Sequence, residues 1–167
     1  MATSTSTPRS LDLRQPFLTR EFRAAGLDLR RLRTKEFRRV FHDVYVLSVV
    51  LDSLSLRARA AMKVAGGRAH ISHITAGELH DLNPPREPSI HVSVPVGATR
   101  CRADGIKAHL ARPDAVVVVR KGIRVSSPMQ TFLDLAGLQG MSLVDLVIVG
   151  DRLVAKRFAT VRQLITA

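Results

Sequence analysis

The chain has 167 residues and a formal net charge of +12, with 46% hydrophobic and 24% charged residues. This hydrophobic fraction excludes a disordered basic tail, and the length suffices for one core with a small satellite domain. Positive charge attracts polyanions, and because no apolar run approaches the ~20 residues of a membrane-spanning helix, we expect nucleic acid rather than a membrane as the partner.

The N-terminal segment is polar. Residues 1–10 are rich in Ser and Thr and lack the apolar core of a signal peptide, so we do not expect export, and we expect residues 1–13 to form a disordered tail. The single Cys101 can neither form an internal disulfide nor hold a zinc site alone. Both features favour a cytoplasmic protein.

Half of the net charge lies in about a sixth of the chain. Residues 14–39 contain nine basic and three acidic residues, a balance of +6. Clustered cations of this kind neutralise DNA phosphates, so this segment is the first candidate for a binding surface.

Two short helices are predicted within this basic segment. Thr19 can cap a helix over residues 20–25, which Gly26 would end. Asp28 can cap a second helix over residues 29–35, with Leu29 and Leu32 facing inward. Two short helices joined by a glycine turn, the second rich in arginine, are typical of a helix-turn-helix.

A β-hairpin is predicted over residues 37–47. Both arms contain β-branched and aromatic residues, and His42 with Asp43 supplies the turn. We interpret it as the wing of a winged helix-turn-helix in residues 14–50. The predicted DNA-binding residues are Arg20, Arg23, Arg30, Arg31, Arg33, Thr34, Lys35, Arg38 and Arg39. Of these, Arg30, Arg31 and Arg33 are the candidates for base edges, while the other cations would hold phosphates.

The remainder, residues 51–167, predicts a small mixed α+β domain, so the fold class is α+β. Helices are expected over residues 53–65, 74–82, 129–136 and 143–155, and strands over residues 69–72, 90–94, 106–110 and 116–119, the last with an extension through 123–125. Ser127 and Thr160 are expected caps, and the last long helix is expected to face inward with Leu143, Leu146, Val147, Leu153 and Val154.

One segment gathers His70, His73 and His80 with a hydroxyl and a carboxylate. A zinc-binding helix places two His four residues apart with Glu between them, whereas His73 and His80 are seven apart. We therefore expect capping and packing roles, with a charged His80 favourable near a helix end.

Acidic residues give no nuclease pattern either. Asp134, Asp145 and Asp151 lie on predicted helices without an adjacent Glu-x-Lys element, and we expect them to be surface or capping residues. The sequence thus predicts no metal, no cofactor and no enzymatic activity.

The order of several short motifs resembles a known family. The run LTREFRAAGLDLRRLRTKEFRRVFHDVYVL, followed by RARAAMKVA, AHISHITAGELHDL, IHVSVP, GIKAH, IRVSSPMQTFLDLAG and LVDLVIVGDRLV, is similar to AbiEi-type antitoxins of type IV toxin-antitoxin pairs. The resemblance covers roughly residues 15–166. It implies a DNA-binding transcriptional repressor of its own operon and a nucleotidyltransferase-like toxin as the genetic partner.

The chain departs from this family in three places. Pro16 would interrupt the full first helix that precedes the turn, and Asp43 stands where a wing glycine is common. Many relatives also continue into a Vsr-like endonuclease domain, which would begin near Leu164. Two alternatives therefore stay open: the targeting portion of a nuclease that lacks its catalytic domain, and a basic protein-interaction module. The oligomeric state is open as well.

Overall fold

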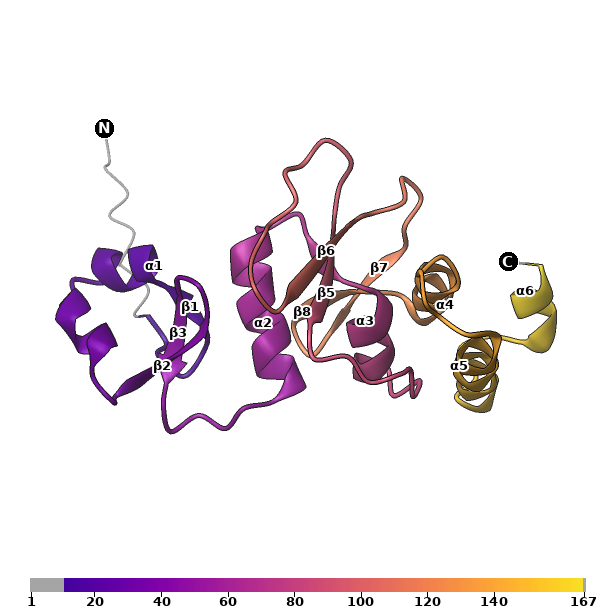
Figure 1. Cartoon of the computed structure of the whole chain (residues 1–167), viewed down its shortest axis with the longest axis horizontal. Helices are drawn as coiled ribbons and strands as arrows, with labels where there is room; N and C mark the ends of the chain where they lie inside the picture. The colour runs from indigo at the N-terminus through magenta and orange to yellow at the C-terminus, as the bar shows by residue number, and fades with distance from the viewer. Residues whose placement is uncertain (1–10, 167) are drawn as a thin grey trace, which may run out of the picture.

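The computed structural model describes residues 11–166, and the N-terminal part forms a small unit around an antiparallel sheet (Figure 1). Its elements are β1 (Phe17–Leu18), α1 (Thr19–Ala24), the 3₁₀-helix η1 (Leu29–Arg33), β2 (Phe37–Phe41) and β3 (Val44–Leu47). The strand order is β1-β3-β2, with all pairs antiparallel.

The second part is built on a five-stranded mixed sheet of order β6-β5-β4-β8-β7. Strands β5 and β6 are parallel, as are β4 and β8, whereas β4–β5 and β7–β8 are antiparallel. The elements are α2 (Leu54–Ala65), β4 (His70–Ile71), α3 (His73–Leu79), β5 (Ile90–Val94), β6 (Ile106–Leu110), β7 (Val117–Arg120), β8 (Ile123–Ser126), α4 (Pro128–Ala136), α5 (Leu143–Ala155) and α6 (Val161–Ile165).

The five-stranded sheet has an apolar face and a polar face. Helix α2 lies on one side and α3 on the other, with α4 and α5 beyond α3 (Figure 1). Because side chains alternate along a strand, Ile90 and Val92 of β5 pack into the cluster that includes α2, while His91 and Ser93 point the opposite way. All five residues of β5 are buried, so polar groups are enclosed beneath α3.

One hydrophobic cluster joins the two parts of the chain. Leu18, Phe41 and Val44 of the N-terminal unit belong to the same buried cluster as Ala58 and Ala61 of α2. The predicted boundary at residue 50 falls in the connection between β3 and α2. Helix α2 is thus packed against the small unit on one side and the larger sheet on the other.

The structure confirms the mixed α+β class but shows no clear winged helix-turn-helix. The predicted hairpin is present, and its turn residue Asp43 has a φ of 63°, a left-handed conformation that Asp tolerates. The predicted arginine helix over residues 29–35 is instead the five-residue 3₁₀-helix η1, capped by Asp28 as expected. No helix precedes β1 among the described residues. The predicted tail of residues 1–13 lies outside the described residues except for 11–13, where Leu11 and Leu13 pack against the N-terminal unit.

Most elements of the second part lie where the pattern predicts them, but the inward face of α5 is different. Leu153 is buried as expected, whereas Leu143 is 77% and Val147 54% exposed. The buried residues of α5 are Val149, Gly150 and Leu153, because the helix packs against α4 and α6 through that side. None of the described helices has the length and apolar character needed to cross a bilayer.

Candidate functional site

The predicted DNA-binding residues are mostly exposed on the N-terminal unit. They lie on α1, on η1, in the loop that follows η1, and on β2. Seven of the nine are exposed, whereas Arg31 and Arg38 are half-buried. The exposed ones are Arg20, Arg23, Arg30, Arg33, Thr34, Lys35 and Arg39.

Three aromatic rings hold the elements that carry these cations. Phe17 of β1 stacks on Phe22 of α1 with ring centroids 5.2 Å apart, and Phe37 of β2 meets both rings edge-on at 5.7 and 5.3 Å. All three side chains are buried, and Leu29 and Leu32 of η1 pack against them. The unit therefore has a small core of its own, which fixes the backbone beneath the arginines.

Arg31 is held by the protein itself. Its guanidinium forms a two-point ion pair with Glu36 and lies about 6.0 and 5.7 Å from the ring centroids of Phe22 and Phe37. The hydrogen bond from Arg31 lowers the pKa of Glu36. Arg38 likewise donates to the Val50 carbonyl and lies 3.6 Å from the Asp52 carboxylate. Both groups are thus engaged in contacts that order the unit.

The other predicted cations have no acidic partner. Within residues 11–166, none of them forms an ion pair with a carboxylate: Arg20, Arg23, Arg30, Arg33, Lys35 and Arg39. Lys63 of α2, in contrast, is bound by Glu21 at 2.7 and 2.9 Å. Within the described residues, six positive charges without a carboxylate partner thus lie between residues 20 and 39.

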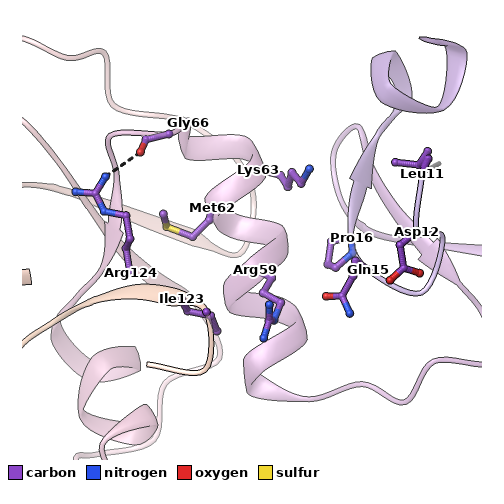
Figure 2. A pocket seen from close by; sticks show the side chains of 12 residues that line it. Leu11, Asp12, Gln15, Pro16, Arg59, Met62, Lys63, Gly66, Ile123 and Arg124 are labelled. Atoms are coloured by element: carbon purple, nitrogen blue, oxygen red, sulfur yellow. Dashed lines mark hydrogen bonds between the residues drawn. The ribbon is translucent and has the colours of Figure 1, made fainter. Parts of the chain in front are cut away.

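A cavity of about 540 Å³ lies between the N-terminal unit and α2. Figure 2 shows Lys63 extending from α2 toward Pro16, while Met62 lies on the side of Ile123 and Arg124. Its cations are already engaged, since Arg124 donates to the Gly67 carbonyl and Lys63 pairs with Glu21. The third lining cation, Arg59, likewise donates to the Lys121 carbonyl, so each of these cations already has a hydrogen-bond partner among the described residues.

A second group of side chains lies on the polar face of the five-stranded sheet. His73 begins α3, His91 lies on β5 and His109 on β6, and one ring nitrogen from each lies within 4.8 Å of the others. The His73 and His109 rings are stacked with centroids 3.7 Å apart. His109 Nε2 lies 3.1 Å from His91 Nδ1, so these two nitrogens share a hydrogen bond. Three imidazoles that can hold a metal ion thus converge beneath α3.

Burial keeps these imidazoles neutral. Burial and the neighbouring His109 lower the pKa of His73 to about 3, and the same two causes lower the pKa of His91 to about 4. Burial also lowers the pKa of His109. Near pH 7 the three rings have lone pairs available, which metal binding requires.

Two of these three histidines were not predicted from the sequence. His70, His73 and His80 are neighbours in the chain, but the structure brings His73 to His91 and His109, which lie on the paired strands β5 and β6. The signal that could have found them is the alternation in IHVSV and IKAHL, which places both histidines on polar faces of adjacent strands.

His80 and Asp134 also differ from the expectation. His80 caps the end of α3, but burial lowers its pKa, so it acts there as a neutral ring whose Nε2 lies 2.8 Å from the Ser126 carbonyl oxygen. Asp134 is half-buried and accepts hydrogen bonds from Ser126 and Gln130, both at 2.8 Å. Asp145 is a capping residue as predicted, paired with Ser142, and Asp151 is exposed.

No family model matches the chain, and no curated protein matches it significantly.

Proposed function

We propose that the chain binds double-stranded DNA through its N-terminal unit and acts as a transcriptional regulator. The observation that supports this best is the set of six exposed cations that have no carboxylate partner in the part of the chain that the structure describes. Unpaired cations release the counterions of DNA phosphates when they bind, whereas cations already paired with carboxylates contribute less.

The contacts of these cations suggest that some bind DNA and others stabilise the unit. Arg30 and Arg33 on η1 and Arg39 on the hairpin are exposed and would contact DNA directly, while Arg31 orders η1 through Glu36. Because η1 is short, its arginines would mostly contact phosphates and the edges of a groove. A long recognition helix, in contrast, would lie within the major groove. The resemblance to antitoxins adds the finer proposal of an autorepressor encoded beside a nucleotidyltransferase-like toxin.

A salt series of DNA binding tests the proposal. We expect the logarithm of the association constant for the protein's own promoter fragment to fall linearly with the logarithm of salt concentration. Replacing Arg30 and Arg33 with alanine should reduce that slope by about 2 and weaken binding on the order of 10–100-fold at 0.1 M salt. Fluorescence anisotropy with a labelled duplex measures both quantities.

The matched control removes the same charge elsewhere. Arg152 and Arg162 are exposed on α5 and α6, at the end of the molecule opposite the N-terminal unit (Figure 1). The double alanine variant of this pair should keep the wild-type slope. Equal losses in both double variants would show attraction by net charge alone and would contradict a defined surface. A protein partner that still co-purifies with the chain after nuclease treatment, in a chain that binds no DNA, would instead favour the alternative of a basic protein-interaction module.

A further inference from the structure

We propose that His73, His91 and His109 bind one divalent transition-metal ion, with zinc as the best fit. Among the described residues this is the group of three or more metal-ligating side chains whose ligand atoms converge within 4.8 Å. The site lies in the larger part of the molecule and involves none of the predicted DNA-binding residues.

All ligand nitrogens lie within 4.8 Å of one another, and one of their separations already suits a tetrahedral ion. Zinc–nitrogen bonds of about 2.0–2.1 Å at tetrahedral angles place two ligand nitrogens roughly 3.3–3.4 Å apart. The observed 3.1 Å between His109 Nε2 and His91 Nδ1 is close to this value. An ion between these nitrogens would replace their hydrogen bond, and the proton on one of them would move to the other nitrogen of its ring or to solvent.

The hydrogen-bonding groups next to the imidazole nitrogens that would not bind the ion also suit a metal site. With His91 Nδ1 on the ion, Nε2 carries the proton, and this buried nitrogen has no hydrogen-bond partner yet lies 3.5 Å from the Glu87 carboxylate. Metal-bound histidines usually donate their other nitrogen to such a carboxylate. Lys107 holds Glu87 in place at 2.8 Å and lowers the pKa of its carboxyl group. His73 Nδ1 similarly lies 2.9 Å from the Ser72 hydroxyl, which leaves Nε2 for the ion.

The donor set selects the class of metal. Three imidazoles suit zinc, cobalt, nickel or copper, whereas magnesium and calcium require oxygen ligands. His73 and His109 are only partly buried, so water can reach the fourth position. A closed hydrophobic group of histidines would offer no such place.

Metal titration of the full chain without an affinity tag tests this site. After treatment with a chelator and dialysis, zinc is added in competition with a chromophoric chelator, and cobalt is added separately to record its visible spectrum. We expect one equivalent of zinc, and cobalt bands of the intensity that four-coordinate sites give. His109→Gln and His73→Asn should each weaken zinc binding at least tenfold. Asn is chosen because His73 has a φ of 48°, which Asn tolerates.

Two further variants make the result independent of folding defects. Glu87→Gln leaves all three ligands in place and should weaken zinc binding about 10–100-fold. His42→Gln, in the exposed hairpin turn, should bind like the wild type. Less than 0.2 equivalent of zinc bound by the folded wild type, or equal binding by His109→Gln and wild type, would overturn the proposal. Because no DNA is present, failure of this test leaves the DNA-binding proposal untouched.

Discussion

Replacing Phe22 with alanine is expected to lower the free energy of unfolding by about 3–5 kcal/mol. The side chain is fully buried, and it contacts both other rings of the aromatic group, Phe17 and Phe37. Its removal leaves a cavity that two rigid rings cannot fill. Urea denaturation followed by circular dichroism measures the loss.

The same substitution at Phe158 is the control. This ring is 42% exposed and has one aromatic neighbour, His80, at 6.2 Å. Its replacement by alanine should cost much less, on the order of 1 kcal/mol. If the two variants lose the same stability, the aromatic group is not the core of the N-terminal unit. Phe22→Ala should also weaken DNA binding, whereas Phe158→Ala should not.

Acidification is expected to destabilise the metal-free protein between pH 7 and pH 5. Burial lowers the pKa of His73 to about 3 and that of His91 to about 4, while both rings titrate near 6.5 when the chain unfolds. The unfolded state therefore binds more protons in this range, and stability falls as the pH decreases. The slope approaches roughly 1.4 kcal/mol per pH unit for each such histidine.

The charged groups around the histidines set the limits of this window. Glu87 opposes the effect by raising the pKa of His91, and Lys107 reinforces it. Glu78, elsewhere on α3, works in the opposite direction, because burial raises the pKa of its carboxyl group and the folded chain therefore takes up that proton more readily than the unfolded chain. Urea titrations at pH 7, 6 and 5 with a chelator present measure the trend. A constant free energy of unfolding across these values would show that the histidines are not buried in their neutral form.

Local patterns predicted much of the fold. The hairpin turn at His42 and Asp43, the strands β5 and β6, and the Ser127 and Thr160 caps depend on neighbours in the chain, and the structure has them where the pattern indicates. Helix α5 shows where local patterns are insufficient. Its apolar residues surround the helix, so the pattern alone does not tell which side packs against α4.

The two candidate sites also differ in how far local sequence patterns could indicate their residues. The sequence could indicate the group of exposed cations between residues 20 and 39, because these residues are close in the sequence, and their role in binding DNA stays a prediction. The histidine group depends on the parallel register of β5 and β6, which pairs Ser93 with His109, and on the return of α3 over the sheet. Strand register depends on contacts between distant parts of the chain. The sequence spacing of His70, His73 and His80 therefore could not indicate the group of His73, His91 and His109.

The position of α2 limits how this protein can be divided. A fragment cut after residue 50 would leave Leu18, Phe41 and Val44 without the rest of their buried cluster, to which α2 contributes. The arginine-bearing hairpin cannot therefore be transplanted to another protein as a free-standing module, and any graft must bring α2 with it.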